Sequence, residues 1–257
     1  MSWLARLRQN RVYRSIFRVP IPKDRRQRVL VILMTFILHI HPTTIPRYAV
    51  RLRHTWCMGG LAFFLFLVEV VTGVLLMFYY RPVPGTAYQD MWELRTSVTF
   101  GIFREVHRWA AHAMIIVVIL HMLRVFFTGS YRPPREFNWM IGVSLLVLTL
   151  LLSFTGYLLP WDQLSLWAAT VGTNMVAATP LIGCEGPGSQ WLTWNGVPLI
   201  TRESDLRYFL LGSSQIDGVA LNRFYVWHCI GLPIFMAFLC GLHFWRVRKD
   251  GRISGPL

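Results

Sequence analysis

Four long apolar stretches constrain the fold of this chain more than any other feature. A helix needs about 20 mainly apolar residues to cross the hydrocarbon core of a bilayer. The first window of that length holds a single charged residue, Glu69. The four windows lie at residues 56–80, 106–127, 137–159 and 224–245. They predict an all-α integral membrane protein, a bundle of four transmembrane helices.

The N-terminal part of the chain is different. A fifth apolar run, residues 29–40, has only 12 residues and is too short to span a bilayer, so we expect it to lie in the membrane interface. We therefore predict a basic, amphipathic interfacial segment at residues 1–54, followed by a four-helix domain at residues 55–257. The longest loop of that domain, residues 160–223, joins the third and fourth spans.

The chain is apolar and strongly basic at once, with 54% hydrophobic residues and a net charge of +14. The predicted side that carries both termini has 19 Lys and Arg against three acidic residues. The opposite side has seven Arg against eight acidic residues. This bias places both termini on the negative, cytoplasmic or stromal side of a bacterial inner membrane or an equivalent energy-transducing membrane. Topology and anionic lipid headgroups account for the basicity, so we expect no nucleic-acid partner.

Histidine is rare inside membrane-spanning segments and is usually functional there. The second window contains His107 and His121, and the fourth contains His228 and His243. At about 100° and 1.5 Å per residue, each pair stays roughly on one helix face, with one member near each helix end. The two helices run in the same direction because one span separates them. His107 is therefore expected level with His228, and His121 level with His243.

Two histidines that face each other from neighbouring helices can hold a flat macrocycle by its two axial positions. Imidazole is a haem ligand, and bundle cores are where such sites are built. Two pairs at matched depths predict two b-type haems, an outer one at His107 and His228 and an inner one at His121 and His243. Two alternatives remain: core histidines with ordinary hydrogen bonds, and proton-relay histidines of a haem-free transporter.

Glycines and arginines at related positions support cofactor binding. A residue without a side chain lets a flat macrocycle approach the backbone, although small residues also serve helix packing. Glycines 14 residues apart lie on the first and third windows: Gly59, Gly73, Gly142 and Gly156. Arg104 and Arg124 each lie three residues from a histidine of the second window. They can reach haem propionates or anchor the helix at the interface.

Several separated motifs resemble one known family. The histidine spacing His107-x13-His121 and His228-x14-His243 occurs with TGYLLPWDQ (155–163) and NRFYVWH (222–228). The segments LHMLRVFFTGSYRPPRE and RKDGRISGPL complete the pattern. Over about residues 42–257 the sequence resembles cytochrome b of the Rieske/cytochrome b quinol oxidoreductases. The ending resembles the short, split form, in which the haem-bearing half is a separate chain.

The resemblance implies a subunit of a quinol:cytochrome c oxidoreductase, or of one with a plastocyanin-like acceptor. Quinol would be oxidised near the outer side, with one electron passing to a Rieske iron–sulfur protein. The second electron would pass through the two haems to a quinone at the inner side, with proton translocation. The implied partners are a separate C-terminal-half cytochrome b subunit, the Rieske protein, a c-type cytochrome subunit and a second copy of the complex.

The resemblance also assigns candidate residues for quinol oxidation, namely Pro160, Trp161 and Asp162. The family completes this site with a Pro-Glu-Trp-Tyr-type motif that this chain lacks. The chain is therefore not expected to catalyse alone. The loop after Gly183 is longer than is usual in the split family and is rich in Trp and Gly. We expect it to contact the Rieske protein or an added subunit.

Cys57 lies in the segment TWCMGG (55–60), which resembles the place where the split family holds a covalent c-type haem by one thioether bond. Arg248, in the similar tail, is then a candidate propionate partner. The sequence has no Cys-x-x-Cys-His motif, so the usual two-thioether attachment is excluded. The alternative for Cys57 is a packed free thiol.

Glu69 stands where the family typically has Gln. A buried carboxyl group tends to be protonated or paired, which suggests a role in a proton path. A rival function for the whole chain is the diheme membrane anchor of a dehydrogenase, which also uses a four-helix bundle with histidine ligands. That rival would need neither the motif at residues 160–163 nor Cys57.

Overall fold

The structure is a computed structural model of the chain, and it describes residues 10, 13, 22–36, 47 and 51–250. Helix α3 (Arg25–Phe36) covers the first part of the apolar run at residues 29–40, whose last four residues lie outside the described part. The end of the tail motif, residues 251–257, also lies outside it. The interfacial position of residues 1–54 stays a prediction.

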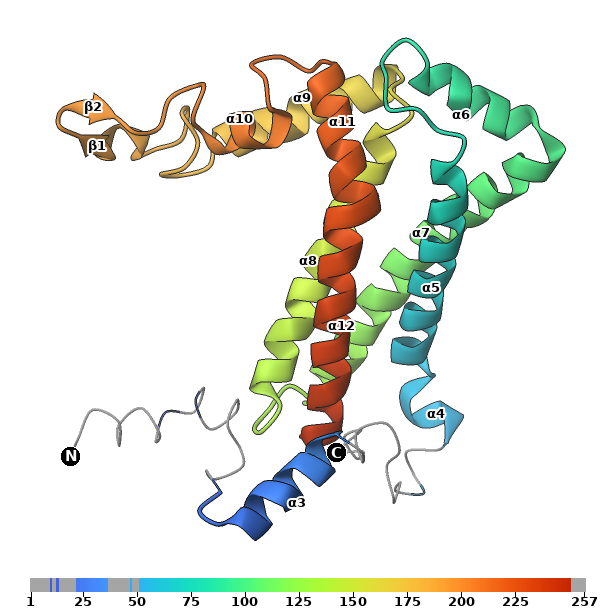
Figure 1. Cartoon of the computed structure of the whole chain (residues 1–257), viewed down its shortest axis with the longest axis vertical. Helices are drawn as coiled ribbons and strands as arrows, with labels where there is room; N and C mark the ends of the chain where they lie inside the picture. Colours follow the sequence, from blue (N-terminus) through green and yellow to red (C-terminus); the bar gives the residue numbers. More distant parts are fainter. Residues whose placement is uncertain (1–9, 11–12, 14–21, 37–46, 48–50, 251–257) are drawn as a thin grey trace. The chain divides into compact units, whose positions relative to one another are not determined.

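The four predicted spans are present as long helical segments (Figure 1). Each has the length and composition needed to cross a membrane. The segments are α5 (Met58–Met77), α7 (Val98–Phe127), α8 (Glu136–Leu158) and a continuous run of α11 (Gly218–Val226), a π-helical turn (Trp227–Gly231) and α12 (Leu232–Lys249). The prediction of a helical membrane protein with four spans is confirmed. The second and fourth segments begin earlier than their apolar windows, at Val98 and Gly218.

The π-helical turn in the fourth segment has a local cause. Pro233 has no N–H group, and in an α-helix its ring would clash with the carbonyl group four residues earlier, at Cys229. The turn Trp227–Gly231 widens the backbone at that place, so the helix continues past the proline. A π turn holds one residue more than an α turn. It therefore takes up the additional residue in the interval between His228 and His243.

The chain packs as two compact units. The terminal unit comprises residues 1–64, 114–148 and 236–257, and the loop unit comprises residues 65–113 and 149–235. Each of the four long helical segments contributes residues to both units. Each unit contains one of the two predicted histidine pairs, so the two candidate sites can be described separately.

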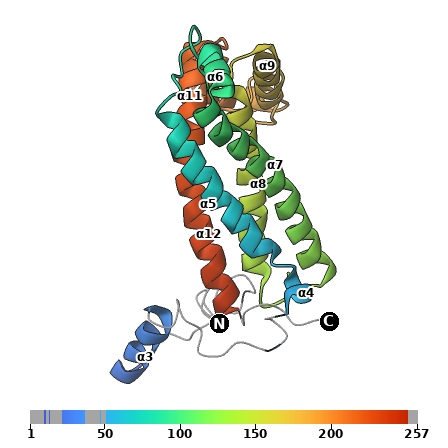
Figure 2. The same cartoon turned by 90° about the vertical axis from the view of Figure 1, so that its right-hand side faces the viewer.

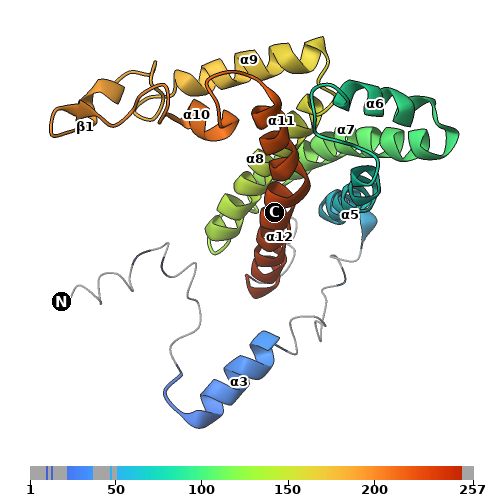
Figure 3. The ribbon, with the colours of Figure 1, turned by 45° about the horizontal axis from the view of Figure 1, so that its top comes forward.

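The core of the loop unit forms where the loop helices pack together. Helices α9 (Gln163–Ala177) and α10 (Leu206–Leu211) lie side by side, and α10 also contacts α11 (Figure 3). Helix α9 buries a small residue at every fourth position, which allows close packing on one face: Ser165, Ala169, Thr173 and Ala177. The largest core side chains are Tyr80, Leu158, Leu159, Leu211, Leu221 and Phe224.

Three aspartates begin the helices of this loop. The side chain of Asp162 accepts a hydrogen bond from the Ser165 N–H group at 2.8 Å, at the start of α9. Asp205 and Asp217 begin α10 and α11 in the same way. An acidic side chain at this position satisfies backbone donors that the helix leaves unpaired. These caps fix where each helix starts.

The Trp-rich part of the loop forms a small hairpin, β1 (Thr193–Trp194) and β2 (Val197–Pro198), paired antiparallel. Its turn is Asn195-Gly196, with φ of 50° and 79°. Asn-Gly is the favoured pair for a two-residue hairpin turn because both positions need positive φ. Contact with the Rieske protein or an added subunit stays a prediction for this segment.

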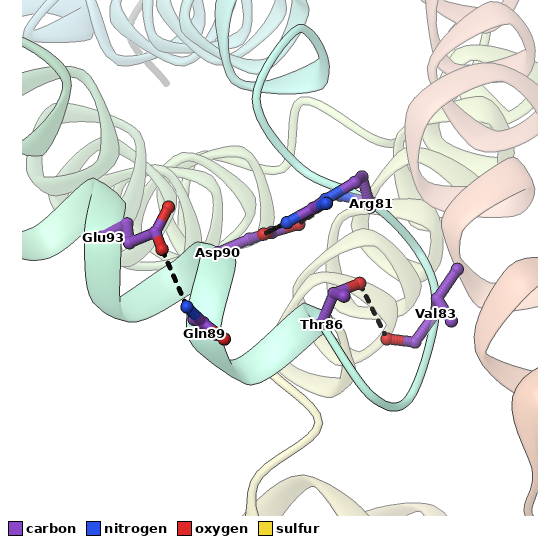
Figure 4. A network of polar contacts seen from close by, with 6 residues as sticks. All are labelled: Arg81, Val83, Thr86, Gln89, Asp90 and Glu93. Carbon is purple, nitrogen blue, oxygen red and sulfur yellow. Dashed lines mark hydrogen bonds and ion pairs between the residues drawn. The ribbon is translucent and has the colours of Figure 1, made fainter.

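An ion pair shapes the turn between α5 and α6 (Ala87–Thr96) in the loop unit (Figure 4). The Arg81 guanidinium donates to both carboxylate oxygens of Asp90, at 2.6 and 3.1 Å, and the Arg81 N–H group donates at 2.8 Å. Arg81 is exposed, while the Asp90 side chain is 2% exposed. These bonds hold the pKa of Asp90 below its usual value. Nearby, the Tyr80 hydroxyl donates to the Leu159 carbonyl at 2.6 Å.

In the terminal unit, the short helix α4 (Leu52–Thr55) leads into α5 (Figure 2). The rings of Phe63 and Phe244 meet edge to face, with centroids 5.0 Å apart. Near the end of α12, Arg246 and Asp250 form a fully buried ion pair at 3.0 Å. The Arg246 guanidinium also lies over the ring of Phe137, 5.1 Å from its centroid.

Candidate cofactor-binding sites

In the loop unit, His107 of α7 and His228 of the π-helical turn face each other. Their ring centroids are 6.1 Å apart and their planes are inclined by 79°. π turns inside helices frequently occur at functional sites. The structure therefore brings together the two residues that the sequence predicts as the outer pair.

Hydrogen bonds on Nδ1 fix the tautomer of His107. Nδ1 lies 2.9 Å from the Thr72 hydroxyl oxygen and 2.9 Å from Oε2 of Glu69. The Thr72 hydroxyl donates its own proton to the Val68 carbonyl at 2.7 Å, so its oxygen accepts from the imidazole. With acceptors on this side, Nδ1 carries the hydrogen. The lone pair of Nε2 is then free to bind a metal.

His228 is fixed in the same way by α8. Its Nδ1 lies 3.1 Å from the Leu152 carbonyl oxygen, which can only accept, and 3.2 Å from the Thr155 hydroxyl oxygen. Thr155 donates its proton to the Leu151 carbonyl at 2.8 Å. Both histidines of this pair are therefore oriented with Nε2 available. Hydrogen bonds of this kind orient histidine ligands at metal sites.

In the terminal unit, His121 of α7 and His243 of α12 form the second pair. Their ring centroids are 6.5 Å apart and their planes are inclined by 81°. The Nδ1 atom of His243 is buried and makes no hydrogen bond of normal geometry with the described residues, although the backbone of Asn138, on α8, acts on this ring. This pair repeats the ring geometry of the first pair, with a weaker polar support on His243.

Each predicted glycine lies against one predicted ligand. A Cβ atom added at Gly59 would lie 3.3 Å from Cε1 of His121, and one at Gly73 would lie 3.2 Å from Cε1 of His107. The corresponding distances are 2.6 Å from Gly156 to His228 and 3.7 Å from Gly142 to His243. The glycines of α5 thus accommodate the imidazoles of α7, and those of α8 accommodate the imidazoles of the fourth segment. They make room for the ligand rings.

The two pairs fit a metal ion held between them. Metal–imidazole bonds are about 2.0–2.1 Å long and the ring centre lies roughly 1.1 Å behind the nitrogen, so rings that share a metal have centroids about 6.3 Å apart. The observed separations, 6.1 and 6.5 Å, lie on either side of this value. Among the described residues, no group of three or more His, Cys, Asp or Glu could hold a metal ion. The two imidazoles at each site are the ligands that the sequence predicts for a flat macrocycle.

The predicted propionate arginines divide between the units. In the terminal unit, Nε and Nη2 of Arg124 and Nη1 of Arg248 are buried without a hydrogen-bond partner in the described part of the chain. Buried guanidinium donors without acceptors are costly, and a carboxylate would satisfy them. Nε of Arg135, which the sequence analysis did not select, is in the same state. In the loop unit, Arg104 is already paired with Glu105 at 2.8 Å.

Cys57 lies immediately before α5 and is an exposed free thiol. Its φ is 51°, and its N–H group donates to the Thr55 hydroxyl at 3.2 Å. Its carbonyl accepts from Leu61 at 2.7 Å, which ties the residue to the first turn of α5. The same turn carries Gly59, which faces His121. The thiol is thus accessible in the unit that contains the second histidine pair.

Of the three predicted quinol-site residues, Asp162 has a clear local role as the cap of α9. Its carboxylate also accepts from the Ser165 hydroxyl at 2.8 Å. Trp161 has a φ of 54° and packs against the core of the loop unit. Pro160 directly follows the Leu159 carbonyl that accepts from Tyr80. The turn at residues 160–162 is therefore rigidly held, and its role with quinol stays a prediction.

Comparisons with known proteins identify the family of this chain. Residues 45–197 match the cytochrome b/b6/petB family. The chain belongs to this family. It is 39% identical over 203 residues to cytochrome b6 of Heliobacterium mobile, covering 79% of this chain and 85% of that protein. Cytochrome b6 of Heliomicrobium gestii is 37% identical with the same coverage.

A solved structure titled hyperthermophilic respiratory Complex III also resembles this cytochrome b, with a TM-score of 0.66 and 27% identity. The match covers 89% of this chain and 56% of that one, so the present chain spans little more than half the length of the solved chain. The resemblance to the short, split form of cytochrome b is confirmed by the two cytochrome b6 relatives.

Sequence reasoning missed the residues that support the loop-unit pair. Thr72 and Thr155 each directly precede a predicted glycine, in the dipeptides Thr72-Gly73 and Thr155-Gly156. The glycines of the terminal unit lack a preceding Thr. Because a residue next to the glycine also faces the ligand helix, the repeated Thr-Gly pair was the signal that could have identified both supports.

Proposed function

We propose that this cytochrome b is the haem-bearing subunit of a quinol oxidoreductase complex and binds two b-type haems. His107 and His228 would hold the outer haem, and His121 and His243 the inner haem. The observation that carries the proposal is the match between each ring separation and the span of a shared metal, with a glycine against every ring. Haem held in this way supplies one-electron transfer.

The chain's own residues suit that task. Two imidazoles at each site would hold the haem iron, and this pair of ligands would leave no position for oxygen or a substrate to bind the metal. The hydrogen bonds to Nδ1 of His107 and His228 hold those rings in a fixed orientation. In the terminal unit, Arg124 offers buried donors to a propionate. Ligands held in a fixed orientation favour rapid electron transfer because little needs to move.

In this proposal, the function of the chain is to carry the second of the two electrons that quinol oxidation releases. The chain takes the second electron at the outer side, where Pro160, Trp161 and Asp162 form part of the quinol site. It delivers this electron to a quinone-reducing site at the inner side and so contributes to proton translocation. The first electron passes to a Rieske iron–sulfur protein. The family assignment favours this function over a dehydrogenase anchor.

We further propose a covalent c-type haem on Cys57, with Arg248 as a propionate partner. The exposed thiol before α5 and the buried, unsatisfied Nη1 of Arg248 support this assignment, and both residues belong to the terminal unit.

The proposed partners are a separate C-terminal-half cytochrome b subunit, a Rieske protein and a c-type cytochrome subunit, in a homodimeric complex. The similarity to two proteins named cytochrome b6 supports the split form and so the separate second-half subunit. The proposed location is the bacterial inner membrane or an equivalent energy-transducing membrane, with both termini on the negative side.

One set of measurements tests these assignments. The purified complex is examined by reduced-minus-oxidised spectroscopy, and the denatured chain is separated on a gel and stained for haem. Two b-type haems per chain and a stained chain are expected, with staining lost in Cys57→Ala. Cys184→Ala is the matched control, because Cys184 lies in the long loop of the other unit and should leave staining unchanged. An unstained chain would reject the Cys57 assignment, and absence of b-type spectra would reject the proposed function.

A further inference from the structure

One of the four candidate ligands differs from the others in its immediate neighbour. Oε2 of Glu69 lies 2.9 Å from Nδ1 of His107, and the Glu69 side chain is 16% exposed. Within the described part of the chain, His107 is the candidate ligand that pairs with a carboxyl group. The corresponding partners of His228 are a carbonyl and a hydroxyl group, which are neutral.

The geometry of α5 directs Glu69 at this ring. Thr72 and Gly73 follow Glu69 by three and four residues, so all three residues lie on one side of the helix. Thr72 supplies a second acceptor for Nδ1, and Gly73 leaves room for Cε1 at 3.2 Å. Glu69, Thr72 and Gly73 together hold the imidazole of His107 in one position against α5.

The Glu69 carboxyl group has no competing partner in the described residues. Its second oxygen, Oε1, is buried without a hydrogen-bond donor. No described Lys or Arg forms an ion pair with it, whereas Glu105, on α7, is paired with both Arg104 and Arg108. Among the described residues, the imidazole of His107 is therefore the ion-pair partner of the Glu69 carboxyl group.

A carboxylate that accepts from the N–H group of a ligating histidine makes the other nitrogen a stronger donor to the metal. A stronger donor stabilises the more positive, oxidised metal and so lowers its reduction potential. We propose that Glu69 is a positioning residue that fixes His107 and lowers the reduction potential of the outer haem. This inference rests on the proposed binding of that haem by His107 and His228. A lower potential at this site favours departure of the electron from it.

The test is an optical redox titration of the b haems in the purified complex at one fixed pH. In Glu69→Gln, which keeps the shape and removes the charge, the outer component should become easier to reduce. We expect the ratio of reduced to oxidised haem at a given potential to rise about tenfold, which is about 59 mV for a one-electron couple. The shifted component is identified as the one absent from His107→Leu. The other component should not move.

Glu93→Gln is the matched control, since it removes a carboxylate from an exposed position in the same unit. It should shift neither component. Unchanged potentials in Glu69→Gln with full haem content would overturn the proposal, as would equal shifts of both components or an equal shift in the control. If the wild-type complex contains no b-type haem, the proposed function itself fails, so the two failures are distinct.

A second variant decides the outcome if Glu69→Gln does not retain the outer haem. Glu69→Asp keeps the charge on a shorter side chain. Retained haem with a potential near that of the wild type supports the role of the charge. Loss of the haem in both variants, or a raised potential in a loaded Glu69→Asp, shows that side-chain shape rather than charge matters, and overturns the proposal.

Discussion

The two histidine pairs have nearly the same ring geometry but different surroundings. In the loop unit, both imidazoles donate from Nδ1 to threonine hydroxyls, and to a carboxyl or carbonyl oxygen. In the terminal unit, Nδ1 of His243 is buried and makes no hydrogen bond of normal geometry with the described residues. The same unit holds two of the predicted propionate partners, Arg124 and Arg248, with buried nitrogens that have no partner among the described residues.

This difference suggests that the two proposed sites select and hold their cofactor by different interactions. The loop-unit site is specified through its ligands, because hydrogen bonds set the tautomer and orientation of each ring before anything binds. In the proposed terminal-unit site, an anion would satisfy the buried guanidinium nitrogens of Arg124 and Arg248, so we expect charge to contribute to binding there. Variants at corresponding positions of the two sites should therefore have different consequences.

The largest effect is expected from removing a ligand. His107→Leu and His121→Leu should each abolish one b-type haem, since a single remaining imidazole leaves the site with one axial ligand. Difference spectra of the purified complex measure the haem that remains. His112→Leu is the matched control, because His112 lies on α7 outside both pairs. Two retained haems in either ligand variant would break the assignment of that pair.

The glycines give a second contrast. A Cβ at Gly156 would lie 2.6 Å from Cε1 of His228, whereas one at Gly142 would lie 3.7 Å from Cε1 of His243. Contacts below 3.0 Å require the backbone or ring to move, so Gly156→Ala should reduce outer-haem content severely. Gly142→Ala should leave the inner haem close to wild type. Haem content per chain is the measurement, and equal losses in the two variants would contradict the close approach at Gly156.

The sequence predicted the elements that depend on pattern. Long apolar windows gave the four spans because the bilayer imposes a minimum length. Equal intervals between His107 and His121 and between the glycine pairs predicted which residues lie together, because residues 14 apart on a helix stay on roughly the same face. Both features are periodic, and periodicity is visible without any knowledge of packing.

Features that depend on contacts between distant residues were not predicted. The pairing of Glu69 with His107 joins different helices, so spacing along one helix cannot show it. The residues of the π turn at His228 are also compatible with an α-helix. Pro233 is the sequence feature that indicates an irregular turn there. Asp162 was selected for quinol chemistry, while its visible contacts are those of a helix cap, a local role that its position before α9 already permits.

Arginine variants test the difference between the two sites through the affinity of the chain for each haem. Arg124→Gln should weaken retention of the inner haem by about 10- to 100-fold, the range typical of residues that support a metal site from outside its ligands. Arg104→Gln should change outer-haem retention much less, because Arg104 is paired with Glu105. Haem loss to an apo-globin acceptor, followed over time, measures both. If Arg104→Gln weakens haem retention more than Arg124→Gln does, arginine charge supports binding mainly in the loop unit, which contradicts this proposal.

The smallest effect is expected away from the histidines, at the Arg81–Asp90 pair of the loop unit. Asp90→Asn should lower the melting temperature of the complex by a few degrees at pH 7, because three hydrogen bonds from Arg81 lose their charged acceptor. The pKa of Asp90 is lower in the folded chain, so its contribution is present above the usual aspartate value of 3.8 and is lost only as the pH falls through the folded value. The difference between wild type and variant should therefore be the same at pH 5 and pH 8. If the difference in melting temperature grows between pH 5 and pH 8, another group near the turn titrates with it. Intact haem spectra in Asp90→Asn would show that the Arg81–Asp90 ion pair stabilises the loop unit without contributing to its ligand geometry.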